Sequence, residues 1–152
     1  MKRFLLVCTV ALAVPVLALA KGPTAATVEG PGVPTLTISG NGEDGGLSRL
    51  GRLTTAVGFF PAVFGQTPDP MLPSRPKGTL GPRYTIVWRV PGPNIASRIR
   101  QVAYPYAKPH PLTYMRPGQP FWEGDRTYGG WFRADPSLRR ILGLPARPRL
   151  GD

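Results

Sequence analysis

The sequence has few of the residues that metal centres and covalent cross-links require. Its 152 residues include one cysteine, Cys8, and one histidine, His110. Structural zinc sites use several Cys and His ligands, and a disulfide needs two thiols. The only acidic pairs, Glu43 with Asp44 and Glu123 with Asp125, do not fit a calcium loop. No phosphate-binding or dinucleotide-binding fingerprint is present. We therefore expect neither a metal nor a cofactor.

Acidic residues are also scarce. The chain has 8 of them against 19 basic residues, a formal charge of +11. A strongly basic protein attracts anionic polymers and surfaces. A second explanation stays open, because a GC-rich coding sequence supplies arginine, glycine, proline and alanine without any ligand to select them.

Long hydrophobic runs are absent except at the start of the chain. Lys2 and Arg3 precede an apolar stretch over 4–17, which ends before Ala18-Leu19-Ala20. The stretch is shorter than the roughly 20 residues of a membrane-spanning helix, and the small residues after it are typical of a signal-peptidase site. We predict a signal peptide over 1–20, with an uncleaved anchor as the alternative. Cleavage after Ala20 removes two basic residues and leaves a thiol-free chain of charge +9, secreted or periplasmic.

What is abundant is glycine (19) and proline (20), which favour loops. Between the loops, the pattern predicts a small α+β, β-rich domain over 21–145: an antiparallel sheet, two short helices, long Pro/Gly-rich loops, and then a flexible tail over 146–152. Apolar alternation predicts strands, and three-to-four spacing predicts helices. The strands are expected at 25–29, 35–39, 83–90, 98–106 and 112–115, and the helices at 47–57 and 136–142, with an apolar core cluster at 59–64, a proline-rich loop at 66–82 and a turn-rich segment at 118–131.

Catalytic patterns are weak. His110 lies between two prolines in an extended stretch, and no serine occupies a G-x-S-x-G turn, so we expect no catalytic residue. One alternative is a carbohydrate-active enzyme or sugar-binding module. It would use Glu123 and Asp125 as its carboxylates, with Trp122 and Trp131 stacking on sugars.

The strongest feature is arginine interleaved with aromatic residues over 83–140. This combination predicts a non-catalytic protein that binds an anionic cell-envelope polymer or a lipid surface, with no transmembrane anchor and no nucleic-acid partner. A further alternative is docking to another exported protein through exposed aromatic side chains. The expected binding residues are Arg83, Trp88, Arg89, Tyr104, Tyr106, Lys108, His110, Trp122 and Trp131.

Four short motifs carry a resemblance. They read LGPRYT at 80–85, YPYA at 104–107, PGQPFW at 117–122 and GGW at 129–131. In these motifs the chain resembles exported bacterial proteins of unknown function from GC-rich genomes, over most of residues 25–145. The resemblance implies export, and it implies that 80–131 forms one unit. It brings no activity, cofactor or site residue.

Overall fold

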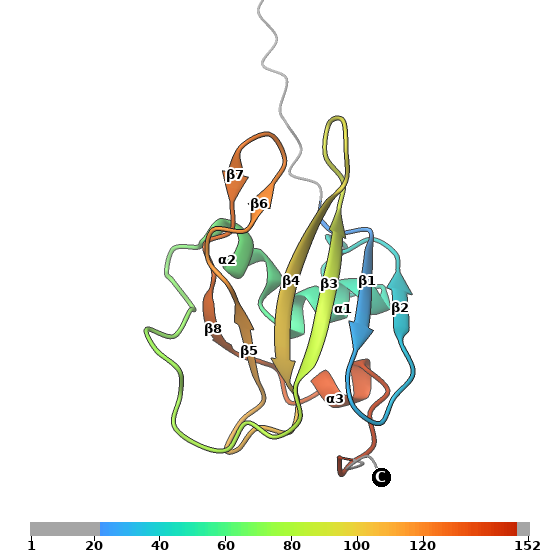
Figure 1. The fold of residues 1–152 in the computed structure, drawn as a ribbon, viewed down its shortest axis with the longest axis vertical. Coiled ribbons are helices and arrows are strands. Elements are labelled where there is room, and N and C mark those ends of the chain that lie inside the picture. The colour runs from blue at the N-terminus through green and yellow to red at the C-terminus, as the bar shows by residue number, and fades with distance from the viewer. Residues whose placement is uncertain (1–21, 149–152) are drawn as a thin grey trace, which may run out of the picture.

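A computed structural model describes residues 22–148, which form a six-stranded antiparallel sheet, a two-stranded hairpin and three short helices (Figure 1). The predicted signal peptide and residues 149–152 of the predicted tail lie outside the described residues. The sheet order is β2-β1-β3-β4-β5-β8, which confirms the small α+β, β-rich fold. The strands are β1 (Ala25–Glu29), β2 (Leu36–Ser39), β3 (Tyr84–Val90), β4 (Ser97–Tyr104), β5 (Leu112–Met115), β6 (Pro120–Phe121), β7 (Asp125–Arg126) and β8 (Gly130–Arg133), and the helices are α1 (Arg49–Ala56), α2 (Phe59–Phe64) and α3 (Leu138–Ile141).

The sheet is assembled from hairpins and one long-range pairing. β1 and β2 form the predicted hairpin, with Ala26 opposite Ile38. β1 also pairs with β3, far along the chain, which places Ala26 opposite Trp88. In both pairs these inward side chains are buried, because successive strand residues point to opposite faces and only one face is covered. Helices α1 and α2 cover that face and lie behind the sheet in Figure 1.

Helix α1 forms where the sequence predicts a helix. The hydroxyl of Ser48 accepts a hydrogen bond from the backbone N–H of Gly51 at 2.9 Å and caps the first turn. Leu50 and Leu53 are fully buried on its inner side. The helix ends at Ala56 with Val57 as its C-cap, and Gly58 follows with a φ of +64°, a left-handed conformation. A Cβ at this position would lie 2.6 Å from the ring of Phe132, so the close packing also requires glycine.

Helix α2 was not predicted, because Pro61 argues against a helix in a sequence pattern. Pro61 is the third residue of α2, where a backbone N–H has no partner within the helix, so proline is tolerated. Two of its apolar residues, Phe59 and Val63, enter the core as expected, whereas Phe64 is 40% exposed.

The predicted helix over 136–142 is shorter in the structure and begins at Leu138. The Asp135 carboxylate accepts a hydrogen bond from the N–H of Ser137 at 2.7 Å, so it closes the turn before the helix instead of capping it. The side-chain hydroxyl of Ser137, and after it this backbone bond, holds the pKa of Asp135 below its ordinary value. Gly143 follows the helix with φ +71°, as a left-handed helix end requires.

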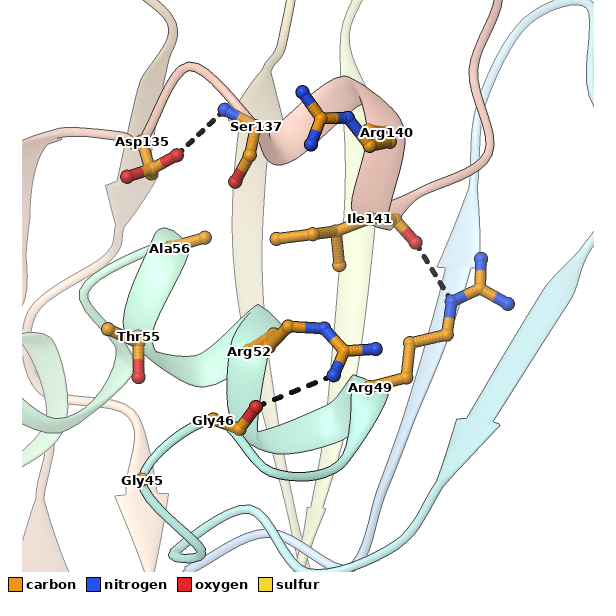
Figure 2. Close-up of a pocket in the computed structure, with 10 residues that line it drawn as sticks. All are labelled: Gly45, Gly46, Arg49, Arg52, Thr55, Ala56, Asp135, Ser137, Arg140 and Ile141. Carbon is orange, nitrogen blue, oxygen red and sulfur yellow. Dashed lines mark hydrogen bonds between the residues drawn. The ribbon is translucent and has the colours of Figure 1, made fainter.

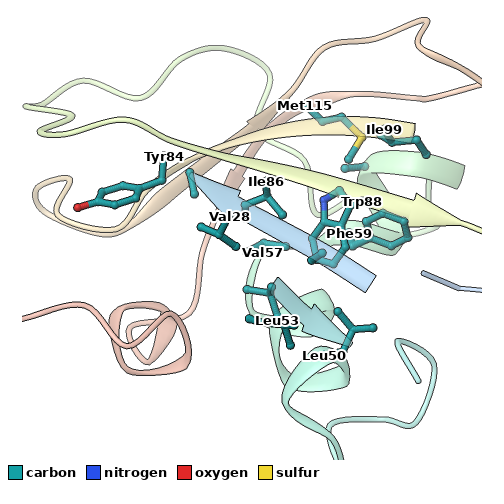
Figure 3. Packing of buried hydrophobic residues seen from close by; sticks show 14 of the residues in the cluster. Val28, Leu50, Leu53, Val57, Phe59, Tyr84, Ile86, Trp88, Ile99 and Met115 are labelled. Atoms are coloured by element: carbon teal, nitrogen blue, oxygen red, sulfur yellow. The ribbon is translucent and has the colours of Figure 1, made fainter. Parts of the chain in front are cut away.

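The core centres on Trp88, which is fully buried against Phe59 at a ring-centroid distance of 4.6 Å (Figure 3). Its indole N–H donates to the Oε1 of Gln101 at 3.1 Å. The side-chain amide of Gln101 donates at 2.8 Å to the backbone carbonyl of Val57, at the end of α1. The hydroxyl of Thr113 donates to the same carbonyl at 2.9 Å. Helix α1 is thus fixed to β4 and β5 by buried polar contacts as well as by apolar packing.

The proline-rich loop over 66–82 pairs with the sheet at one bridge, Leu72 with Trp131. Trp131 belongs to β8, a strand that the sequence did not predict because Gly129 and Gly130 read as turn residues. Pairing with β5 makes this segment extended. A segment that becomes a strand only because another strand lies beside it carries no clear strand signal in its local sequence.

Candidate binding face of the sheet

The sheet face opposite α1 and α2 is open and faces the viewer in Figure 1. Its side chains are the outward members of each strand. On β3 they are Thr85, Val87 and Arg89, and Arg83 precedes the strand in the same alternation. All four are at least partly exposed, whereas their inward neighbours are buried. The sequence therefore folds into a sheet whose outer surface carries the basic side chains.

Three arginines lie together on this face. Arg89 and Arg98 are directly opposite each other in the β3–β4 register, and Arg100 is the next outward residue on β4. Across β1, the partner of Arg89 is Ala25. Arg100 is opposite Val87. Of these cross-strand pairs, only Arg89 with Arg98 places like charges directly opposite each other, which disfavours the strand pairing.

The backbone under these arginines is held firmly. Gln119 is buried, and its Oε1 accepts from the N–H of Arg100 at 2.8 Å. Its amide Nε2 donates to the carbonyl of Arg100 at 2.7 Å. Gln119 therefore takes the place of a strand partner beyond the end of β5. The backbone of Arg100 is therefore hydrogen-bonded to the side chain of Gln119 where β5 no longer pairs with β4.

Aromatic residues continue the face beside the arginines. The cross-strand register aligns Val102, Tyr114 and Trp131 in one row over β4, β5 and β8. The ring centroids of Tyr114 and Trp131 are 4.9 Å apart, and Tyr104 stacks beside Trp131 at 6.0 Å. Each ring is half-buried. We call Arg89, Arg98, Arg100, Tyr104, Tyr114 and Trp131 the outer-face cluster.

Of the residues predicted from the sequence, Arg89, Tyr104 and Trp131 belong to this cluster, and Arg83 lies at its border. The prediction omitted Arg98, Arg100 and Tyr114. The signal that finds them is the two-residue alternation of β4 and β5, which places these side chains on the face that carries Arg89.

The other predicted residues lie elsewhere. The prediction that Trp88 binds a ligand is wrong. Its side chain lies on the inward side of β3, so it is fully buried and cannot touch a ligand. Tyr106 packs under Arg139, whose guanidinium carbon is 5.7 Å from its ring centroid, and its hydroxyl donates to the carbonyl of Pro145 at 2.8 Å. Burial raises the pKa of Tyr106. Lys108 and His110 are exposed in the loop after β4.

Trp122 is in the β6–β7 hairpin, away from Trp131. Its indole N–H donates to the carbonyl of Pro91 at 2.8 Å, and its ring lies 5.1 Å from that of Phe121. Its φ of +46° is left-handed, a strained conformation for a bulky residue. These bonds and contacts hold it there.

The two candidate carboxylates are exposed on the same hairpin. Glu123 accepts a hydrogen bond from the side-chain amide of Asn94 at 2.5 Å and lines a groove beside the β3–β4 connection. Asp125 does not line that groove. Trp131 packs against Tyr104 and Tyr114 on the sheet face. The residues expected for carbohydrate chemistry are therefore divided between two regions: Trp122, Glu123 and Asp125 lie on the β6–β7 hairpin, and Trp131 lies on the sheet face.

A second basic region is an open groove of about 520 Å³ between α1 and α3 (Figure 2). The Nε of Arg49 donates to the carbonyl of Ile141 at 2.9 Å, and Arg52 donates to the carbonyl of Leu47 at 3.2 Å. These arginines tie loops and helix ends to α1. Because their donors serve the fold in this way, the outer-face cluster is the better candidate site.

Within residues 22–148, no helix has the length and apolar character needed to cross a membrane. The same residues contain no group of three or more His, Cys, Asp or Glu side chains that could hold a metal ion. Comparison with known proteins identifies no relative: no family model matches the chain, and neither a curated protein nor a solved structure matches it significantly.

Proposed function

We propose that this is an exported, non-catalytic protein that binds an anionic polymer or surface of the cell envelope through the outer-face cluster. Export rests on the sequence of residues 1–20 and on the resemblance carried by 80–131. Binding rests on the charge and on where the fold places it.

The observation that carries the proposal is the pair Arg89 and Arg98. Like charges directly opposite each other oppose strand pairing, yet these two lie opposite each other on the neighbouring strands β3 and β4, close to the β3–β4 turn, with Arg100 beside them. An anion bound between them removes that repulsion. A polyanion with many weak contacts suits such an open face better than a small molecule, which needs an enclosing pocket.

The test is retention of the chain beginning at Lys21 on a bacterial cell-wall fraction and on anionic phospholipid vesicles. We compare Arg89→Gln/Arg98→Gln/Arg100→Gln with Arg75→Gln/Arg140→Gln/Arg147→Gln. The second variant makes the same change in charge at exposed residues outside the outer-face cluster.

At low salt the first variant should lose about 100-fold in affinity, since each basic residue near an anionic surface contributes about fivefold. The second variant should lose much less. Binding of the unaltered chain should also weaken steeply as salt is added. Equal losses in the two variants would show that only net charge matters, and absence of binding at low salt would refute the proposal.

A further inference from the structure

We infer that the ligand of the outer-face cluster is an acidic polysaccharide, a chain of sugars that carries carboxylate or phosphate groups. This inference rests on the proposed function and adds the chemical class of the polymer. It comes from the position of the aromatic rings relative to the arginines.

Both kinds of side chain lie on one continuous surface. Along β4 the outward residues run from Arg98 and Arg100 through Val102 to Tyr104. Beside them, Tyr114 and Trp131 extend the row across the sheet. Arginine pairs with anionic groups, often through two parallel hydrogen bonds, and aromatic rings bury the C–H faces of sugars. A polymer that offers both groups in alternation matches both parts of the face.

Anionic lipids and polyanions without sugars match only the arginines of this face. The large hydrophobic side chains most exposed among residues 22–148 are Leu47, Phe64, Ile95 and Tyr128; of these, Ile95 lies in the β3–β4 connection and lines a groove together with Arg98. On the face itself the aliphatic side chains are Val87 and Val102, and both are partly buried, which offers little apolar surface for insertion into a lipid bilayer. A polyanion without sugars would engage the arginines and leave the rings unused.

The dimensions of the cluster fit a polymer segment. From Arg98 to Tyr104 the strand covers six residue steps, about 20 Å at roughly 3.4 Å per residue. At the Arg98 end the face meets the groove lined by Ile95 and Trp122, so a long chain can lie across the face and continue along that groove. Affinity should therefore rise with the length of an oligosaccharide until the oligosaccharide covers the whole cluster. Beyond that length, the affinity of each binding site should stay constant.

The experiment measures the affinity of the protein at low salt for three soluble probes: polygalacturonate, poly-glutamate of matched charge and length, and neutral dextran. Polygalacturonate should bind about tenfold more tightly than poly-glutamate, because the aromatic rings of the face contact the C–H faces of sugars and poly-glutamate has none. Dextran should bind much more weakly than either. Galacturonate oligomers of increasing length test the expected rise in affinity.

Trp131→Leu and Tyr114→Leu should lower polygalacturonate affinity by about tenfold and leave poly-glutamate affinity unchanged. The matched control is Tyr128→Leu, which removes an exposed aromatic ring from another part of the surface and should leave both affinities unchanged. Circular dichroism identifies any variant that fails to fold. In that case the probe comparison with the unaltered protein decides the question.

Equal affinity for polygalacturonate and poly-glutamate would overturn the inference while leaving the proposed function intact. Tighter binding to anionic vesicles than to polygalacturonate would do the same and point to a lipid surface. If no polyanion binds at low salt, the proposed function fails as well.

Discussion

The Arg89–Arg98 pair allows a test of the fold that needs no ligand. If the pair is held in place against its own repulsion, Arg98→Gln should make the protein more stable. Glutamine keeps part of the aliphatic stem and the capacity for hydrogen bonding, so the change removes mainly the charge. Most substitutions destabilise a protein, and the sign of this prediction is therefore informative.

The magnitude follows from the register. Directly opposed side chains have Cβ atoms about 5 Å apart, and two long side chains that splay hold their charges roughly 7 Å apart. Two unit charges about 7 Å apart in water repel by about 0.6 kcal/mol. Arg100, the next outward residue on β4, adds to this repulsion. We expect Arg98→Gln to raise the free energy of unfolding by about 0.5–1 kcal/mol at low ionic strength.

Urea unfolding at two salt concentrations measures this effect, since urea carries no charge. Between about 0.01 M and about 1 M salt the screening length falls from about 30 Å to about 3 Å, so the stabilisation should disappear at high salt. The control is Arg133→Gln. Arg133 is an exposed strand arginine whose cross-strand partner is Leu112, so its removal should give no comparable gain. A loss of stability in Arg98→Gln at low salt, or a gain that persists at high salt, would refute the reasoning.

Two further predictions concern the fold. Gln101→Leu leaves the buried indole N–H of Trp88 without an acceptor and should lower the free energy of unfolding by about 2 kcal/mol, measured by urea titration. A change below about 0.5 kcal/mol would mean that this bond matters little. At the surface, the hydroxyl of Tyr128 donates to the Asp69 carboxylate at 2.6 Å, and this bond lowers the pKa of Asp69 below its ordinary value of 3.8. A lowered carboxyl pKa stabilises the fold above the unfolded-state pKa, and that contribution is lost as the pH falls through the folded-state pKa. The stability difference between the unaltered protein and Tyr128→Phe should therefore shrink below about pH 4, and a constant difference from pH 7 to pH 2 would contradict the assignment.

Local sequence patterns were sufficient for the elements that carry their own signals. The hairpin of β1 and β2 has two β-prone runs around a turn-rich connector, and β3 has a strict alternation of buried and exposed residues. Helix α1 has apolar residues at helical spacing and a serine cap. In each case the information is contained within about ten residues, because strand alternation and helix periodicity are properties of the backbone itself.

Tertiary structure decided the elements and the site that depend on distant partners. Strand β8 is extended because β5 lies beside it, and α2 tolerates Pro61 because the proline falls in its first turn. Composition showed that arginine and aromatic residues are abundant between 83 and 140. The alternation of β3 separates Trp88 from Arg89, but only the packing of the helices decides which side faces the core, and only the sheet register places Arg98, Arg100 and Tyr114 on the surface with Arg89. A binding face made from several strands is set by their pairing, and pairing between segments far apart in the chain leaves little trace in local sequence.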